Sequence, residues 1–403
     1  MIKIRTDLNL DPSSQSTRRG RACELTMWTG CYRLASTNCA PIGFRPLCQR
    51  DKAESPIRRA AGHFFTRIVE SVRDLVSTQT TAVRDGSQYA AILAKQEFRA
   101  ELERLFPTEG GQRTPDEVRF QILRFHTNRS VFNVSITRNS GWQSLIAKVF
   151  AVDRPDTLHA MQRIHQAGFG PTAQFAIPRP IAYLSSLRIL LEEKVEGKQV
   201  KTILLEDDKS EQMEAVRRCG EWLARFHTKA PRFGNRVECR PFLEHVRGWA
   251  DMVSGFGKPF TAKCESLMKK LEAMVPIEGT FEYCQGHGSY IPSHVLLSNE
   301  RTVTIDFDEL ELVDPARDLA WFLIALERFE LKYHRPPDFY ERLSGPFLEA
   351  YLKEGNRNTL RHLAFYKAAE YLHRARHDLY KRIPPVPEWA EKMLDQALTG
   401  FAS

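Results

Sequence analysis

Hydrophobic runs long enough to cross a membrane are missing from this sequence. Of the 403 residues, 42% are hydrophobic and 27% are charged, which is the usual balance of a globular protein. No apolar stretch approaches the roughly 20 residues that a membrane-spanning helix requires, and the first residues lack the apolar core of a secretion signal. We therefore expect a cytoplasmic protein without a membrane partner.

Closely spaced cysteine pairs, which are typical of zinc sites, are missing as well. The chain has eight cysteines, and those of the N-terminal group are separated by seven or eight residues. The two groups are Cys23, Cys31, Cys39 and Cys48, and Cys219, Cys239, Cys264 and Cys284. We expect reduced thiols. The net charge of +8 is spread along the chain without a nucleic-acid-binding motif, so we predict no nucleic-acid partner.

Residues 1–86 have little hydrophobic periodicity. Serine, threonine, arginine, cysteine and proline are interleaved there, and such a composition buries too little apolar surface to fold by itself. We expect a disordered or poorly packed extension. A transit peptide, or an overextended start with translation beginning downstream, explains the same composition, and the sequence leaves these alternatives open.

The middle of the chain alternates between helical and strand-like patterns. Apolar residues recur at helical spacing over 89–106, and three apolar, β-branched or aromatic runs follow. These runs are Phe120 to Phe125, Val131 to Ile136 and Leu145 to Phe150. A helix over 155–167, opened by Pro155, and a strand over 187–195 complete this part.

The C-terminal half reads mainly as helices. The predicted segments are 210–229, 315–330, 338–353, 359–381 and 387–398. Asp314 followed by Pro315 is a natural start for the second of these helices.

Chemistry-bearing residues are concentrated between His287 and Ala320. A kinase-type catalytic loop has the pattern His-x-Asp-x-x-x-x-Asn, followed by a strand that ends in a metal-binding aspartate. Here the loop runs from His287 through Ser289 to His294, and a strand over Thr302 to Ile305 ends in Asp306, Phe307 and Asp308. The ending DPARDLA follows at 314–320.

These elements, in this order, resemble the aminoglycoside phosphotransferase and choline kinase superfamily, whose pattern is HGDxxxxN, then IDF or IDW, then DPxxDLA. The resemblance implies an α+β, two-lobed, protein-kinase-like fold, with a small antiparallel-sheet N-lobe over 87–197 and a mainly helical C-lobe over 198–403. It also implies ATP and Mg²⁺ as cofactors, and transfer of the ATP γ-phosphate to a hydroxyl of a small molecule.

The resemblance assigns a nucleotide-binding role to three segments. Lys148 stands at the position of the small-lobe lysine that contacts ATP phosphates, although a strand lysine reaching to water is the alternative. Glu193 and Val195 stand where the family hinge binds the adenine edge. The turn that covers the phosphates falls at Asn128, Arg129 and Ser130, where an ordinary polar hairpin explains the residues equally well.

The same motif departs from the family at its chemical positions. Ser289 replaces the catalytic aspartate and His294 replaces the metal-binding asparagine, while Asp306, with Asp308 beside it, keeps the metal position. His287 matches the loop histidine, which in the family orients the loop by hydrogen bonding; it stands beside Ser289 as a candidate site residue, with an architectural part rather than that of a base. Because a serine carries no negative charge, it cannot act as the base, and we expect a weakened catalytic loop. Loss of base assistance lowers the reaction rate by about 10² to 10⁴-fold.

Two further departures support a different function class. No glutamate occurs between Arg154 and Phe169 to pair with the lysine, since Thr157 stands at that position with Asp156 beside it, and the phosphate turn has no glycine. A pseudokinase, which binds a nucleotide or regulates a partner without turnover, is therefore the alternative hypothesis.

The segment 357–382 is rich in basic residues. In the family the C-terminal helices line the acceptor site, and polycationic acceptors need carboxylates there. The basic residues are Arg357, Arg361, Lys367, Arg374, Arg376, Lys381 and Arg382. We expect a neutral or anionic acceptor, with a solvated helix face as the plainer explanation.

Overall fold

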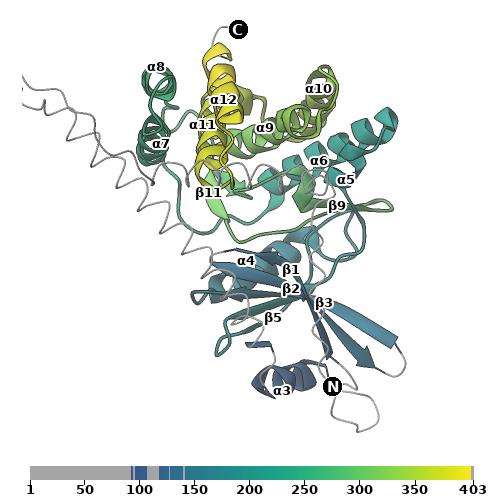
Figure 1. Cartoon of the computed structure of the whole chain (residues 1–403). Helices are drawn as coiled ribbons and strands as arrows, with labels where there is room; N and C mark the ends of the chain where they lie inside the picture. The colour runs from purple at the N-terminus through teal and green to yellow at the C-terminus, as the bar shows by residue number, and fades with distance from the viewer. Residues whose placement is uncertain (1–91, 94–95, 107–117, 127, 139–140, 401–403) are drawn as a thin grey trace, which may run out of the picture. The chain divides into compact units, whose positions relative to one another are not determined.

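The computed structural model describes residues 92–93, 96–106, 118–126, 128–138 and 141–400. The predicted extension over 1–86 lies outside these residues. The chain divides into two compact units (Figure 1). The first unit ends at Asp153 and also includes Leu184–Ile189. The second unit comprises Arg154–Tyr183 and the chain from Leu190 onward. The lobe boundary after residue 197 stays a prediction. Within the described residues, no helix is both long and apolar enough to traverse a bilayer.

The first unit is built on an antiparallel sheet with a helix. Its elements are α3 (Gln96–Leu105), β1 (Val118–Phe125), β2 (Arg129–Arg138) and β3 (Gly141–Phe150). β2 pairs with both β1 and β3. Phe98 of α3 lies 6.0 Å from Phe120 of β1, centroid to centroid, and Phe120 is paired with Val134 of β2. Because paired residues share a sheet face, α3 packs on the face that carries Val134.

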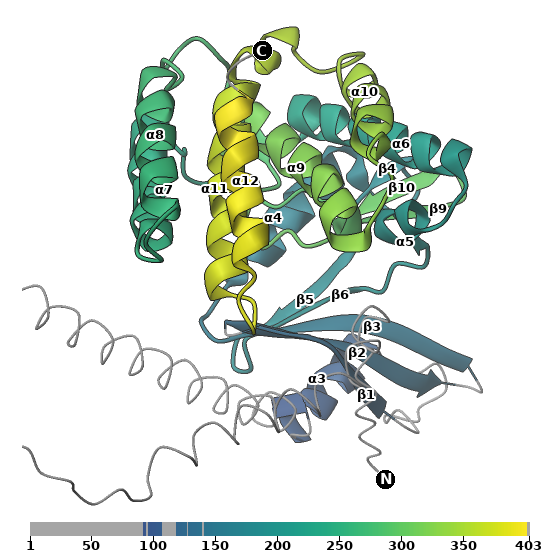
Figure 2. The ribbon, with the colours of Figure 1, turned by 45° about the horizontal axis from the view of Figure 1, so that its top comes forward.

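The second unit is mainly helical. Its helices are α4 (Pro155–Ile164), the π-helix η2 (His165–Phe169), α5 (Val200–Leu205), α6 (Lys209–Lys229), α7 (Cys239–Ser254), α8 (Phe260–Ala273), the 3-10 helix η3 (Pro292–His294), α9 (Ala316–Tyr333), α10 (Phe339–Tyr351), the 3-10 helix η4 (Arg357–His362), α11 (Leu363–Tyr380) and α12 (Pro387–Thr399). In Figure 2, α7 lies beside α8 and α11 beside α12. These four helices and α9 share one apolar core.

Short strands connect these helices. They are β4 (Phe175–Ala176), β7 (Lys198–Gln199), β8 (Cys284–Gly286), β9 (Val295–Ser298), β10 (Arg301–Thr304) and β11 (Glu311–Val313). One sheet has the order β4-β10-β9-β7, and β11 pairs with β8. Two further strands, β5 (Pro180–Leu184) and β6 (Ile189–Glu193), carry the chain through the boundary between the units.

The helical predictions agree with the structure to within a few residues, apart from one region. The predicted helix over 359–381 begins as η4 before α11. Helices α7 and α8 had no counterpart among the predicted segments. Pro155 occupies the first turn of α4, as expected, because its missing N–H would have no partner there.

Gly220 allows α6 to approach α10 closely. A Cβ atom on Gly220 would lie 2.2 Å from the carbonyl oxygen of Phe347. We expect Gly220→Ala to lower the free energy of unfolding by about 2–3 kcal/mol, because the backbone of α10 must move. Urea denaturation followed by circular dichroism measures this.

Gly248→Ala is the matched control. Gly248 lies in α7, and a Cβ there would meet nothing within 4 Å. Alanine should raise stability by about 0.5–1 kcal/mol, through its helix propensity. Equal effects of the two substitutions would contradict the packing argument.

Candidate functional site

A hairpin returns the chain to the loop that follows β8. β9 and β10 pair antiparallel, with Val295 opposite Thr304, and the Ile305 amide donates to the His294 carbonyl at 2.8 Å. The end of β10 is therefore held beside His294. As a result, Asp306 lies next to the loop that carries Ser289, although it is 17 residues further along the chain.

His294 links Ser289 to Asp306. Its Nδ1 lies 2.9 Å from the Ser289 carbonyl oxygen, which can only accept, so Nδ1 carries a proton. Its Nε2 lies 3.5 Å from Asp306 Oδ2. A neutral ring in this tautomer presents a lone pair to a carboxylate, and two acceptors repel each other. A proton on Nε2 or a metal ion between the two atoms would make this contact favourable.

Asp306 and Asp308 differ in their surroundings. Asp306 has a left-handed backbone, with φ of 74°, which is uncommon for a residue with a side chain. Asp308 is buried, and its carbonyl oxygen accepts from the Arg154 guanidinium at 3.0 Å. The fold therefore places Asp306 in contact with His294. It fixes the backbone of Asp308 through Arg154, the residue that precedes α4.

His287 has a structural position in the loop. Its Nε2 donates to the Ile305 carbonyl at 3.0 Å, and its Nδ1 then accepts from the Ser289 amide at 3.4 Å. The ring is fully buried. These contacts orient the loop and agree with an architectural part for His287, while its role in catalysis stays a prediction.

Asp318 of α9 anchors the beginning of the same loop. Its Oδ2 accepts from the His287 amide at 2.6 Å, and its Oδ1 accepts from the Gly288 amide at 3.0 Å. His227 donates to Oδ2 at 3.2 Å, and the other nitrogen of that ring lies 3.0 Å from the Tyr351 hydroxyl. Burial opposes ionisation of Asp318, but the hydrogen bond from His227 and the loop amides outweigh it and hold the pKa below its ordinary value.

Aromatic side chains pack beneath the loop. Tyr290 stacks on Trp222 at 5.6 Å and on Phe322 at 5.3 Å, and its hydroxyl donates to the Cys219 carbonyl. Phe307, which follows Asp306, lies 5.0 Å from the His287 ring. Both chain segments of the site are thereby tied to the core of the second unit.

The first unit separates two of the predicted phosphate contacts. On β2 and β3, Val131 is paired with Lys148, and Arg129 with Phe150. Because side chains alternate along a strand, Arg129 and Lys148 share one sheet face and Ser130 lies on the other. Ser130 is fully buried, on the face that α3 covers. Asn128 is exposed in the short connection between β1 and β2.

The predicted hinge offers one backbone amide rather than two. The Glu193 amide donates to the Arg179 carbonyl at 2.9 Å, and the Glu193 carboxylate accepts from the Arg179 amide. Among the described residues, the Val195 amide has no such partner. Gly197 is required for close approach rather than for a turn, because a Cβ there would lie 2.9 Å from the Leu297 carbonyl oxygen.

The position of the missing helix glutamate is buried. Thr157 of α4 is 2% exposed, and its hydroxyl has no hydrogen-bond partner within the described part of the chain. Asp156 is exposed and pairs with Arg154 at 3.1 Å. Asp156 is thus paired with Arg154, the residue that immediately precedes its own helix.

The arrangement of loop, β10 and α9 is matched by known proteins. Residues 131–366, more than half of the chain, match the phosphotransferase enzyme family. The chain belongs to this family. No curated protein matches the sequence of this phosphotransferase significantly.

Solved structures share the fold of the phosphotransferase. An amicoumacin kinase in complex with AMP-PNP, Ca²⁺ and Ami has a TM-score of 0.52 at 13% identity, covering 77% of this chain and 96% of that one. Choline kinase from Cryptosporidium parvum Iowa II has a TM-score of 0.52 at 12% identity, over 76% and 96%. A putative aminoglycoside phosphotransferase from Ralstonia eutropha JMP134 has 0.51 at 13%, over 75% and 94%. These matches confirm the predicted α+β kinase-like fold.

The donor atoms at the end of β10 fit a divalent cation. The 3.5 Å between His294 Nε2 and Asp306 Oδ2 is near the roughly 3 Å that separates neighbouring ligands of one ion. Among the described residues, no group of three or more histidine, cysteine or acidic side chains could hold a metal alone. Further ligands would therefore come from water or nucleotide phosphates, as Mg²⁺ sites commonly use.

Sequence reasoning missed one set of side chains near the loop. Phe242, His245 and Trp249 of α7 line a cavity that also includes Gly288. Their i, i+3, i+7 spacing is the signal that could have found them, since it places all three on one helix face. The cavity itself depends on how α7, α9 and α11 pack.

Replacing Asp318 with asparagine should destabilise the protein. The amide group would place a donor against the donors of the loop or His227, at a cost of about 2–4 kcal/mol. Because the folded pKa of Asp318 is lowered, its contribution is fully present above the unfolded pKa of about 3.9 and is lost as pH falls through the folded pKa. Chemical denaturation at pH 7 measures the loss.

Asp314→Asn is the control. Asp314 accepts from the Ala316 amide and from His362, but burial raises its pKa despite these bonds. Its ionised form is therefore disfavoured by folding, and a neutral amide should cost less than at Asp318. An equal or larger loss at Asp314 would contradict the anchoring role of Asp318.

Replacing His294 with asparagine should change the metal preference. Imidazole nitrogen favours Mn²⁺ and Zn²⁺ over Mg²⁺, which favours oxygen. We expect the preference for Mn²⁺ over Mg²⁺ in nucleotide binding to fall about tenfold, or about 1.4 kcal/mol. Calorimetric titration of ATP analogue with each metal tests this, and an unchanged preference would exclude His294 as a ligand.

Proposed function

We propose that this phosphotransferase transfers the γ-phosphate of ATP to a hydroxyl group of a small molecule. The observation that carries the proposal is the contact of three motif positions in one site. Ser289, His294 and Asp306 are joined by the two His294 contacts, at 2.9 and 3.5 Å. Kinases in the solved matches act on amicoumacin and choline by name, which supports a small-molecule acceptor.

Nucleotide binding is assigned to residues of both units, each by its own surroundings. Lys148 is 4% exposed in an apolar strand, where a cation is tolerated mainly beside an anion, and Arg129 shares its sheet face. The Val195 amide can donate to an adenine edge, whereas the Glu193 amide is used by Arg179. Ser130, on the other face, and Asn128 are the weaker candidates for phosphate contacts.

Metal binding is assigned to Asp306, with His294 as the second ligand and Asp308 as a nearby carboxylate. A divalent cation at this place would neutralise charge that develops on the transferred phosphoryl group. Asp306 presents its carboxylate from a strand end whose backbone is bonded to His294, so the ligand is held before any ion binds. His287 keeps the loop in the orientation that this requires.

The transfer itself forms one bond and breaks another. The acceptor hydroxyl oxygen bonds to the γ-phosphorus, the bond from that phosphorus to the bridging oxygen breaks, and ADP leaves. The hydroxyl proton passes to water, because Ser289 has no charge with which to take it. Positioning carries most of the catalysis in such loose transition states, so the serine slows the reaction without removing it.

A pseudokinase is the second candidate. Thr157 is buried at the position of the helix glutamate, and Asp156 is paired with Arg154. Together with Ser289, this favours a protein that binds nucleotide and regulates a partner without turnover. The two candidates differ in one measurable quantity, steady formation of phosphorylated product.

Two substitutions test the proposal on the full chain. Asp306→Asn should abolish metal-dependent ATP turnover, because it removes the anionic ligand, while exposed Asp338→Asn should leave it unchanged. Ser289→Asp should raise turnover at least tenfold, because it would restore part of the base assistance. That assistance raises rates by about 10² to 10⁴-fold. Mass spectrometry of a metabolite panel supplies the readout. Nucleotide binding without product in any variant would favour the pseudokinase.

A further inference from the structure

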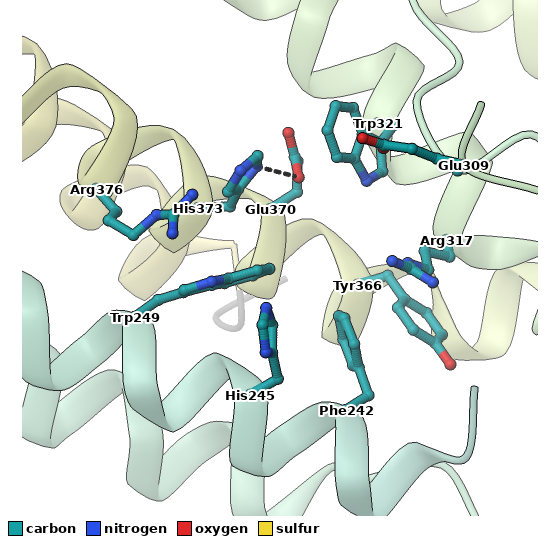
Figure 3. Close-up of a pocket in the computed structure, with 11 residues that line it drawn as sticks. Phe242, His245, Trp249, Glu309, Arg317, Trp321, Tyr366, Glu370, His373 and Arg376 are labelled. Atoms are coloured by element: carbon teal, nitrogen blue, oxygen red, sulfur yellow. Dashed lines mark hydrogen bonds and ion pairs between the residues drawn. The ribbon is translucent and has the colours of Figure 1, made fainter. Parts of the chain in front are cut away.

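A cavity of about 260 Å³ lies against the loop that carries Ser289. Its walls come from α7, α9 and α11, together with Gly288 and Glu309 (Figure 3). A Cβ on Gly288 would lie 3.0 Å from the Glu309 Cβ, so the Glu309 side chain begins beside the loop. One end of the cavity is therefore next to Ser289.

Charged side chains of both signs line the cavity. In Figure 3, Arg376 lies far from Glu309, whereas Arg317 lies on the same side as Glu309 and Glu370 lies beside His373. The second carboxylate, Glu370, is bonded to His373 at 3.1 Å and to Arg374 at 2.5 Å. Burial opposes its ionisation, but these cations keep its pKa low. Glu370 is thus already neutralised by the protein.

Arg376 interacts with the charge of Glu370 without forming a direct ion pair. Within the described part of the chain it forms no ion pair, and its Nε is buried without a hydrogen-bond partner. Arg317, by contrast, is bonded to Glu311 at 2.8 Å. The pKa of His245 is lowered by partial burial and by the nearby charges of Arg376, Arg317 and His373. This end of the cavity thus has a guanidinium whose buried Nε has no hydrogen-bond partner within the described residues.

The aromatic walls are occupied by the protein's own cations. Arg376 lies over the Trp249 ring, 5.6 Å from Cζ to centroid, and Arg317 lies over Phe242 at 5.1 Å. Arg374 lies over Trp321 at 4.6 Å. A ligand ammonium would compete with these guanidiniums for the ring faces and be repelled by them. An aromatic cage for a cationic acceptor is therefore disfavoured.

The C-terminal helices line the acceptor site in the family, and we propose that the acceptor bound in this cavity is an anionic hydroxyl compound whose phosphate or carboxylate lies against Arg376. The inference rests on the proposed phosphotransfer function and names its substrate class. A guanidinium suits both anions, because each accepts two parallel hydrogen bonds. The opposite end of the ligand lies beside Gly288 and Glu309, and the Glu309 carboxylate accepts a hydrogen bond from the acceptor hydroxyl and so orients it.

Binding of four matched hexose compounds tests the charge preference. Glucose is neutral, gluconate carries a carboxylate, glucose 6-phosphate carries a phosphate, and glucosamine carries an ammonium. Calorimetric titration of the full chain with each, and with inorganic phosphate, should give at least about tenfold tighter binding of an anionic compound than of glucose, and the weakest binding for glucosamine. Comparison of gluconate with glucose 6-phosphate separates the two anion types. Failure of every anion to bind, or tightest binding of glucosamine, would overturn the proposal.

Substitution of Arg376 locates the anion. Arg376→Gln should weaken anion binding at least about tenfold and leave glucose unaffected, while Arg376→Lys should restore part of the loss. Arg361→Gln is the control, because Arg361 is exposed and lies outside the cavity lining. An equal loss in both glutamine variants, or none in Arg376→Gln, would refute the site.

Separate measurements distinguish this inference from the proposed function. Metal-dependent binding of an ATP analogue should be the same in Arg376→Gln and the parent protein. If a neutral or cationic acceptor is phosphorylated at the same rate by Arg376→Gln as by the parent protein, the cavity assignment is overturned and phosphotransfer still stands. Anion binding that depends on Arg376, without any phosphorylated product, would support the anion site and overturn phosphotransfer. Glu309→Gln should lower kcat without weakening anion binding, because Glu309 orients the acceptor hydroxyl and does not contact the anion.

Discussion

The buried carboxylate of Asp318 holds the site together. It accepts from two consecutive loop amides and from His227, so α9, α6 and the loop after β8 share one acceptor group. A buried carboxylate is costly unless all of its lone pairs are used, and here the partners are numerous enough to lower its pKa. The positions of His287 and Ser289 follow from this anchor, because the chain has little freedom immediately after two bonded amides.

A second constraint comes from the hairpin of β9 and β10. It returns Asp306 to His294, and the His294 ring then spans the distance to Ser289. The site is therefore a closed chain of contacts, from α9 through the loop to β10. A change of asparagine to histidine in such a chain alters both the donor set for a metal and the packing of the loop. This is why the substitution bears on metal preference more directly than on the fold.

The arrangement combines a maintained scaffold with altered chemical groups. The loop anchor, the hairpin and the aromatic core all lie within residues 131–366, which match the phosphotransferase enzyme family. Ser289, His294 and Thr157 stand at the positions where the sequence predicts a changed charge or donor type. The cavity beside Gly288 is lined by Arg376, which forms no direct ion pair within the described part of the chain, and by the Glu309 carboxylate. A guanidinium in this place suits an anionic group of a ligand rather than a polycation.

The sequence by itself determined the family, the fold class and most helices, because the motif between His287 and Ala320 has fixed spacing and the helical periodicity is strong. It also placed Lys148 on a buried strand. The tertiary structure alone decided that Ser130 lies on the opposite sheet face from Lys148, since strand register is set by pairing. It also decided that α7 contributes a cavity wall, and that Arg374 rather than Arg376 forms a direct ion pair with Glu370. The cavity wall depends on contacts between residues more than 100 positions apart, such as Phe242 and Tyr366, and the other two facts depend on strand pairing and side-chain contacts. Local sequence patterns do not specify such contacts.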